Sequence, residues 1–212
     1  MIMAKQRTFG KLRDREREAR RRLIVDAALR VFATRPFDRA SMREIAAEAG
    51  IAASSIYTYF PDQQALFIEA MTRESAPLIE KLERIVGRSR GAAALERVTI
   101  AFVEFFMEHD SYFRMMTHFM MQGELGEESA RRVGEIMRSV FDNLDRLLPG
   151  KDARSTRLNS HSYFAALNGI LITFRRYPGR GRDELVRHMR QVGRKLAAMA
   201  ASGMIEPGKD GV

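Results

Sequence analysis

The chain has 212 residues, enough for one or two domains with a buried core, and its 45% hydrophobic and 30% charged content is typical of a soluble globular protein. It has no cysteine, no metal-ligand spacing among its four histidines, no apolar run long enough to span a membrane and no secretory signal in its first residues. We therefore expect a cytoplasmic protein without metal or cofactor. The net charge of +9 favours nucleic acid or another anionic surface as partner.

The chain begins with a strongly basic stretch. Residues 1–22 carry nine lysines and arginines against three acids, a net charge of +6. The first dozen residues show no apolar period, so we expect a disordered basic arm over residues 1–18. A helix then runs to about Thr34, where apolar residues recur at helical spacing, and Pro36 stops it. Apolar residues recur every three or four positions along most of the chain, so the sequence predicts an all-α fold.

The next two segments predict a helix-turn-helix. In SMREIAAEAG, Ser41 and Glu44 have the spacing of a capping box, and Gly50 suits the left-handed residue that ends a helix. A very short second helix, at about 53–59, fits before Pro61. Two short helices joined by a glycine-containing turn form this DNA-binding motif, which we assign to residues 19–62.

The second short helix has two different faces. Ile56 and Phe60 lie one turn apart and are expected on the inner face. The outer face holds Tyr57 together with small hydroxyl-bearing residues, among them Ser55 and Thr58. A helix with small side chains can enter the major groove closely, and its hydroxyl groups can hydrogen-bond phosphates or base edges.

Beyond this motif, the sequence predicts only further helices. Asp62 is a good N-cap for a helix over about 63–86, which Pro77 kinks or splits. The later helices are predicted at about 92–108, 111–122, 127–148, 153–176 and 183–202, and residues 203–212 are predicted to be frayed.

The sequence from LIVDAALRVFATRPFDRASMREIAAEAG through IAASSIYTYFPDQQALF resembles the TetR family of bacterial transcriptional regulators. The apolar positions, the turn, the Tyr-x-Tyr-Phe cluster and the following helix are in register over some 45 residues. The resemblance implies a three-helix N-terminal DNA-binding domain. It also implies a larger helical domain, here residues 63–202, that binds a small ligand and forms a homodimer.

Three positions depart from the family pattern. Pro36 stands where the family often has glycine after the first long helix. Ala52 and Ser54 occupy places where serine and glycine are common, and the missing cap at Ala52 costs roughly 1 kcal/mol. Gln63 replaces a lysine that often meets a phosphate, so one ionic contact to DNA is expected to be absent.

From the motif and the resemblance we predict a set of DNA-binding residues on and beside the second short helix. They are Arg22, Ser41, Arg43, Ala53, Ser54, Ser55, Tyr57, Thr58 and Tyr59. Whether the basic arm also contacts DNA stays open, because charged tails are common and often bind nothing specific.

A second set of candidates follows from the stretch 101–122, which is rich in phenylalanine and methionine, and from the place where the family keeps its ligand. The predicted ligand-binding residues are Phe102, Phe105, Phe106, Met115, Met116, Phe119, Met120, Phe141, Tyr163 and Asn168. Methionine suits pockets for varied apolar ligands, whereas helical spacing alone favours a plain core. An apolar or aromatic effector is expected.

The final two predicted helices are assigned to the dimer interface. Ala165 and Gly169 permit close helix approach, and an apolar stripe that begins with Leu185 and Met189 follows the last helix. The alternative is that these residues only cover their own domain.

The sequence thus favours a dimeric repressor that leaves a near-palindromic DNA site when it binds a small ligand. Two alternatives stay open: an activator with the same fold, and a helical small-molecule binding protein with only non-specific DNA affinity. A nucleophile–base arrangement and a phosphate-cradling loop are both missing from the sequence, so an enzyme is not expected. The basic N-terminal helix needs its apolar stripe for packing, so a membrane partner is not expected either.

Overall fold

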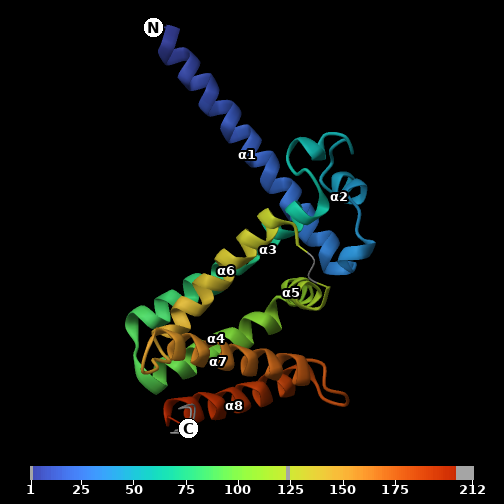
Figure 1. Ribbon diagram of the computed structural model, residues 1–212. Helices are drawn as coiled ribbons and strands as arrows, with labels where there is room; N and C mark the ends of the chain where they lie inside the picture. Colours follow the sequence, from blue (N-terminus) through green and yellow to red (C-terminus); the bar gives the residue numbers. More distant parts are fainter. Residues whose placement is uncertain (1, 123–124, 204–212) are drawn as a thin grey trace. The chain divides into compact units, whose positions relative to one another are not determined.

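The computed structural model describes residues 2–122 and 125–203, which form an all-α fold, as the sequence predicted (Figure 1). The chain divides into two compact units. The first comprises Met1–Arg73 and Ser111–Arg132, and the second comprises Glu74–Asp110 and Val133–Val212. Among the described residues, no helix combines the length and the apolar composition that a membrane span requires.

The first unit contains the residues predicted to form the helix-turn-helix. Its elements are α1 (Ile2–Thr34), the 3-10 turn η1 (Phe37–Arg39), α2 (Met42–Glu48), the 3-10 turn η2 (Ile56–Thr58), and parts of α3 (Gln63–Arg88), α5 (Asp110–Gln122) and α6 (Glu127–Asp145). α1 packs directly against α2, where Ala28 and Ala46 are fully buried and permit close approach. Ile45, Ile56 and Phe60 complete this core, and each contributes about 1.5–3 kcal/mol by its burial.

The local signals that bound α2 are confirmed. The Ser41 Oγ accepts a hydrogen bond from the Glu44 amide at 3.2 Å, and the Glu44 carboxylate accepts one from the Ser41 amide at 3.1 Å. Gly50 follows the helix with φ of 70°, a conformation that L side chains rarely adopt. α3 begins after Asp62, whose carboxylate accepts from the Ala65 amide at 2.7 Å.

α1 is longer than the sequence predicted. The helix begins at Ile2, so the expectation that the first dozen residues lack secondary structure is wrong. The described side chains over residues 11–20 are all exposed, so burial does not hold this part of the helix together. Ion pairs one turn apart, Glu16 with Arg20 at 2.7 Å and Glu18 with Arg22 at 3.4 Å, favour the helix instead.

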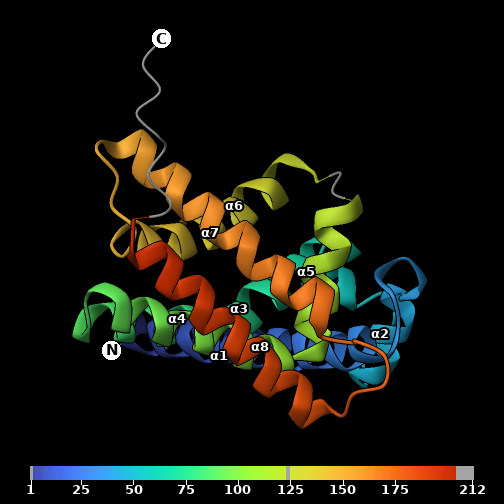
Figure 2. The ribbon, with the colours of Figure 1, turned by 90° about the horizontal axis from the view of Figure 1, so that it is seen from below.

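The second unit is built on α4 (Gly91–Glu108), α7 (Ala153–Phe174) and α8 (Arg182–Ala201). α4 packs against α8 and α7, and α7 runs beside α8 (Figure 2). α4 and α8 approach so closely at Gly193 that a Cβ atom there would lie 2.7 Å from Thr99 Cγ2. Leu185 and Met189, predicted to belong to a dimer-forming stripe, are buried within this unit because α8 uses that face to cover α4.

From residue 63 onward, the predicted helix limits agree with the structure to within a few residues. α3 continues through Pro77, which therefore does not split it. α6 ends at Asp145, three residues earlier than predicted, because the amides of Leu147 and Leu148 both turn back to the Leu144 carbonyl before Pro149. The predicted frayed tail lies outside the described residues, except for Gly203.

Candidate DNA-binding interface

The segment between Gly50 and Pro61 forms a series of turns rather than the short α-helix expected at 53–59. Its only regular element is η2, and its amides bond mostly to carbonyls three residues back, as Ser55 does to Ala52 at 2.9 Å. The cause lies in its first residues. Ala52 has no capping side chain, and the residue that precedes η2, Ser55, makes no side-chain cap bond.

The two faces of this recognition segment, residues 53–59, are arranged as predicted. Ile56 and Phe60 are buried, at 0% and 1% exposure, and anchor the segment in the core of the first unit. Tyr57 is 54% exposed. Exposed positions are also occupied by Ala53, Ser54, Ser55 and Thr58. The segment therefore presents one phenol and three aliphatic hydroxyl groups to solvent on a rigid base.

The end of the recognition segment is fixed to α1 by Arg21. Its guanidinium donates to the Tyr59 carbonyl at 3.1 Å and lies 4.3 Å above the centre of the Phe60 ring. The same guanidinium pairs with Glu69 on α3 at 2.9 Å, and Arg132 on α6 pairs with that carboxylate at 2.8 Å. Sequence reasoning missed this network, because its paired members are separated by 38 to 63 residues.

The electrostatic balance at Glu69 favours the charged form. Partial burial raises the pKa of Glu69, but the hydrogen bonds and charges of Arg21 and Arg132 outweigh the burial, and the pKa lies below its ordinary value. The carboxylate is therefore ionised at neutral pH and holds both guanidinium groups in place.

The other predicted DNA-binding residues lie on α1, at the start of α2 and at the end of the recognition segment. Arg43 is exposed on α2, whereas the Ser41 hydroxyl is engaged with Glu44 at the start of that helix. Tyr59 is half-buried, and Arg22 is exposed on α1 and pairs with Glu18. Gln63, at the position where the family often has lysine, donates to the Phe37 carbonyl at 2.7 Å, so its amide has a structural role.

The predicted ligand-binding residues are distributed over both units. In the second unit, Phe102, Phe105 and Phe106 are buried on α4, and Phe102 lies 4.6 Å from Phe106 between ring centres. Phe164 on α7, which the sequence did not single out, connects this group to Phe141 on α6, with centroid distances of 5.8 Å to Phe102 and 5.3 Å to Phe141. These rings form one aromatic cluster.

Two predicted polar groups on α7 are also buried. Burial raises the pKa of Tyr163 to about 12 despite the hydrogen bond between its hydroxyl and Thr99. Asn168 is 4% exposed and donates to the Phe164 carbonyl at 2.8 Å, but its Oδ1 has no hydrogen-bond partner among the described residues. A buried acceptor without a donor is costly, so Asn168 is the polar group in this unit that a ligand donor would satisfy.

The methionine-rich part of the prediction belongs to the first unit. Met115 and Met116 are buried on α5, whereas Met120 is 52% exposed. The side chain of Phe119 lies outside the described residues. His118, on the same helix, packs against Phe37 with ring centres 5.0 Å apart, so it is part of an aromatic contact within the first unit.

A helix-turn-helix with an exposed, hydroxyl-rich recognition segment defines a DNA-binding regulator. Residues 24–70 match the family described as "Bacterial regulatory proteins, tetR family". This match confirms the resemblance of the N-terminal part to the TetR family of transcriptional regulators.

Relatives with similar sequence or fold are also regulators. The chain is 23% identical over 160 residues to a fatty acid metabolism regulator protein of Bacillus subtilis, covering 71% of this chain and 81% of the relative. Among solved structures, a putative transcriptional regulator from Pseudomonas aeruginosa superimposes with a TM-score of 0.71, at 19% identity over 89% of this chain and 93% of the other. The Bacillus subtilis regulator FadR in complex with stearoyl-CoA gives 0.65, at 18% identity over 85% and 97%. At these identities the two structures support the fold alone.

Proposed function

We propose that this regulator is a homodimeric repressor that binds a near-palindromic operator and leaves it when a small apolar ligand binds the C-terminal domain over residues 63–202. The observation that carries the proposal is the exposed hydroxyl-rich face of residues 53–59 on the DNA-binding domain over residues 19–62. Ser54, Ser55 and Thr58 are short enough to approach base edges, and Tyr57 reaches a phosphate.

Dimer formation through the C-terminal helices is supported by an exposed face of α7. Leu158 and Ile172 are 58% and 61% exposed, and Ala165 and Gly169 lie between them at helical spacing. Large apolar side chains at both ends of a stripe of small residues suit close packing against the same helix of a second subunit. A two-fold symmetric dimer places two recognition segments on two half-sites, which is why the operator is expected to be near-palindromic.

A long acyl chain is the first candidate for the ligand. The aromatic cluster of the second unit provides an apolar environment, and the free Oδ1 of Asn168 accepts one hydrogen bond from a bound molecule. The related regulators named above include one of fatty acid metabolism and one that binds stearoyl-CoA. The ligand releases DNA because it binds more tightly to a conformation whose two recognition segments do not fit the operator.

The first experiment is selection of bound duplexes from a random DNA library at physiological salt. We expect enrichment of a two-fold symmetric site, with half-sites one helical turn apart or more. Binding without enrichment would mean that the basic surface attracts DNA only non-specifically, and enrichment of a single asymmetric half-site would contradict the dimer.

The effector is tested on the selected operator with stearoyl-CoA, free stearate and coenzyme A alone. We expect only the two acyl compounds to release the protein, and we expect Asn168→Leu to weaken this release without weakening DNA binding. Equal release by coenzyme A alone would contradict an apolar effector. The sign of regulation is read from a reporter fused to the operator, where higher expression after deletion of the regulator supports repression over activation.

A further inference from the structure

The N-terminal part of α1 is an exposed, highly charged helix whose purpose the helix-turn-helix core does not explain. Residues 11–22 carry seven cationic and three acidic side chains, a net charge of +4. Over residues 11–20 every side chain is exposed, and Leu12 is the only large apolar residue among them. A helix without an apolar face has no means of inserting into a lipid surface, so a polyanion in water is the better partner.

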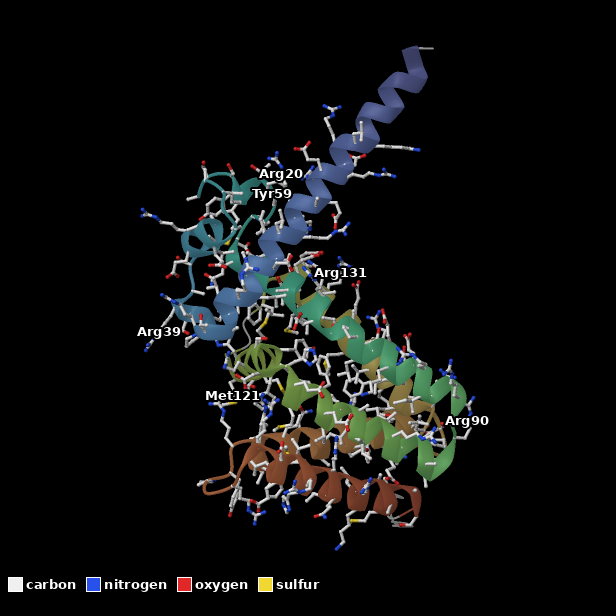
Figure 3. All side chains as sticks on the ribbon, turned by 180° about the vertical axis from the view of Figure 1, so that it is seen from behind. Arg20, Arg39, Tyr59, Arg90, Met121 and Arg131 are labelled. Atoms are coloured by element: carbon white, nitrogen blue, oxygen red, sulfur yellow. The ribbon has the colours of Figure 1, made fainter. Side chains whose placement is uncertain are left out.

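One face of this helix borders a hollow of about 350 Å³ beside the recognition segment. The residues that line it come from α1 and from the end of that segment: Arg13, Glu16, Arg17, Arg20, Thr58 and Tyr59. Figure 3 shows the side chains of Arg20 and Tyr59 next to one another, one from each wall. Three guanidinium groups and one carboxylate give the hollow a positive charge.

Two of the arginines are free to bind an anion. Arg20 is positioned by a hydrogen bond with the Tyr59 side chain and by Glu16 at 2.7 Å, and these contacts raise its pKa. Arg13 and Arg17 form no ion pair with the residues that the structure describes. They lie one helical turn apart, with Cβ atoms about 5–6 Å from each other, so both can reach neighbouring phosphates of one strand.

The opposite face of the same helix carries a second cationic row that does not border the hollow. At 100° per residue, Lys11 and Arg15 point away from Arg13 and Arg17. The two rows carry the same charge and are both exposed, but they differ in their position relative to Thr58 and Tyr59. This difference separates a defined binding site from a merely basic arm.

We propose that Arg13 and Arg17, with Arg20 and Tyr59, form a clamp for DNA backbone phosphates next to the bases that the recognition segment reads. The proposal rests on the DNA-binding function proposed above, because Thr58 and Tyr59 belong to the same segment. Unlike a disordered arm, a rigid helix holds its arginines in place before DNA binds, so little conformational entropy is lost on binding. The clamp also supplies ionic contacts that offset the one lost with Gln63.

The test compares two double variants that remove the same charge from the same helix. Arg13→Gln with Arg17→Gln removes the row beside the hollow, and Lys11→Gln with Arg15→Gln removes the opposite row. All four positions are exposed, and both variants keep the Glu16–Arg20 pair. Affinity for the selected operator is measured by fluorescence anisotropy at several salt concentrations, and circular dichroism checks that the helix content is unchanged.

Loss of two phosphate contacts lowers the slope of log K against log salt by about 1.8 per bound subunit. For the hollow-facing variant, the fall in affinity between 50 and 200 mM salt should therefore be about twelvefold smaller per subunit than for the wild type. The opposite-face variant should keep the wild-type slope. Equal slopes for the two variants, whether both reduced or both unchanged, would overturn the clamp.

Two further measurements identify the anion and separate this proposal from the function on which it rests. Neutral methylphosphonate linkages beside the read bases should weaken the wild type but leave the hollow-facing variant unaffected; equal weakening of both would overturn the clamp. The wild type and both variants are also tested for binding to anionic phosphatidylglycerol vesicles. If the wild type binds them and only the hollow-facing variant loses this binding, the hollow is a lipid site instead. If the wild type selects no sequence at all, the proposed regulatory function fails instead, independently of the two slopes.

Discussion

Glu69 offers the sharpest test of how the recognition segment is held. Glu69→Gln keeps the shape of the side chain but removes the charge that Arg21 and Arg132 share, at 2.9 and 2.8 Å. Both guanidinium groups then lose their counter-ion in a site where the Glu69 side chain is only 27% exposed. Hydrogen bonds to charged groups contribute about 1.5–3 kcal/mol each, and solvent screening lowers this value at partly exposed sites.

We therefore expect Glu69→Gln to lower the free energy of unfolding by about 1–2 kcal/mol, measured by urea denaturation. DNA affinity should fall as well, by about fivefold or ~1 kcal/mol, because Arg21 also holds the Tyr59 carbonyl. Glu80→Gln is the matched control, since Glu80 is exposed on the same helix and forms no ion pair with the described residues.

The pH dependence gives the same prediction an independent check. The pKa of Glu69 is lowered in the folded protein, so its stabilising contribution is fully present above the unfolded value of about 4.3. The contribution is lost as the pH falls through the lower folded-state value. The difference in stability between wild type and Glu69→Gln should accordingly shrink in acid. If the variant unfolds at the same urea concentration and binds DNA as the wild type does, the network does not support the recognition segment.

Three further predictions concern other elements. Tyr57→Phe should weaken DNA binding by roughly 1 kcal/mol on all sequences alike, since the lost hydroxyl meets phosphate; a loss confined to one base position in competition assays would mean that Tyr57 reads a base. Gly50→Ala should lower the unfolding free energy by about 1–2 kcal/mol, because the φ angle of Gly50 is 70°. The control Gly87→Ala, inside α3 with open space around it, should be neutral or stabilising. Equal effects of the two changes would refute the conformational explanation. Tyr163 stabilises the fold fully below its unfolded pKa of 10.0, and about 2–3 kcal/mol of this contribution is lost as the pH rises to about 12. Tyr163→Phe should therefore flatten the decline of the unfolding free energy at alkaline pH. An unchanged decline would contradict the burial of a neutral phenol at this position.

Most of the helical framework could be predicted from local signals. The capping box of Ser41, the left-handed Gly50 and the Asp62 cap act over three or four residues, and the structure contains all three. The same reasoning placed Ile56 and Phe60 inside and Tyr57 outside. These predictions succeeded because each depends on near neighbours in the chain.

The errors arose where stability comes from weak or distant interactions. Residues 2–18 have no apolar period, and the ion pairs Glu16–Arg20 and Glu18–Arg22 favour the helix only at the end of this stretch, a signal that the search for apolar stripes ignored. Helical period showed that Leu185 and Met189 share a face but not that α4 covers it. The Arg21–Glu69–Arg132 network joins three helices, and sequence spacing contains no information about such contacts.

The close approach at Gly193 constrains how this regulator can change over evolution. A methyl group there would meet Thr99, whose hydroxyl bonds both the Leu95 carbonyl and the buried Tyr163. Because Thr99 is fully buried, the added atom would have to displace it, and α4, α7 and α8 would lose their alignment together. Mutations selected for a new effector should therefore accumulate around the aromatic cluster while position 193 stays glycine.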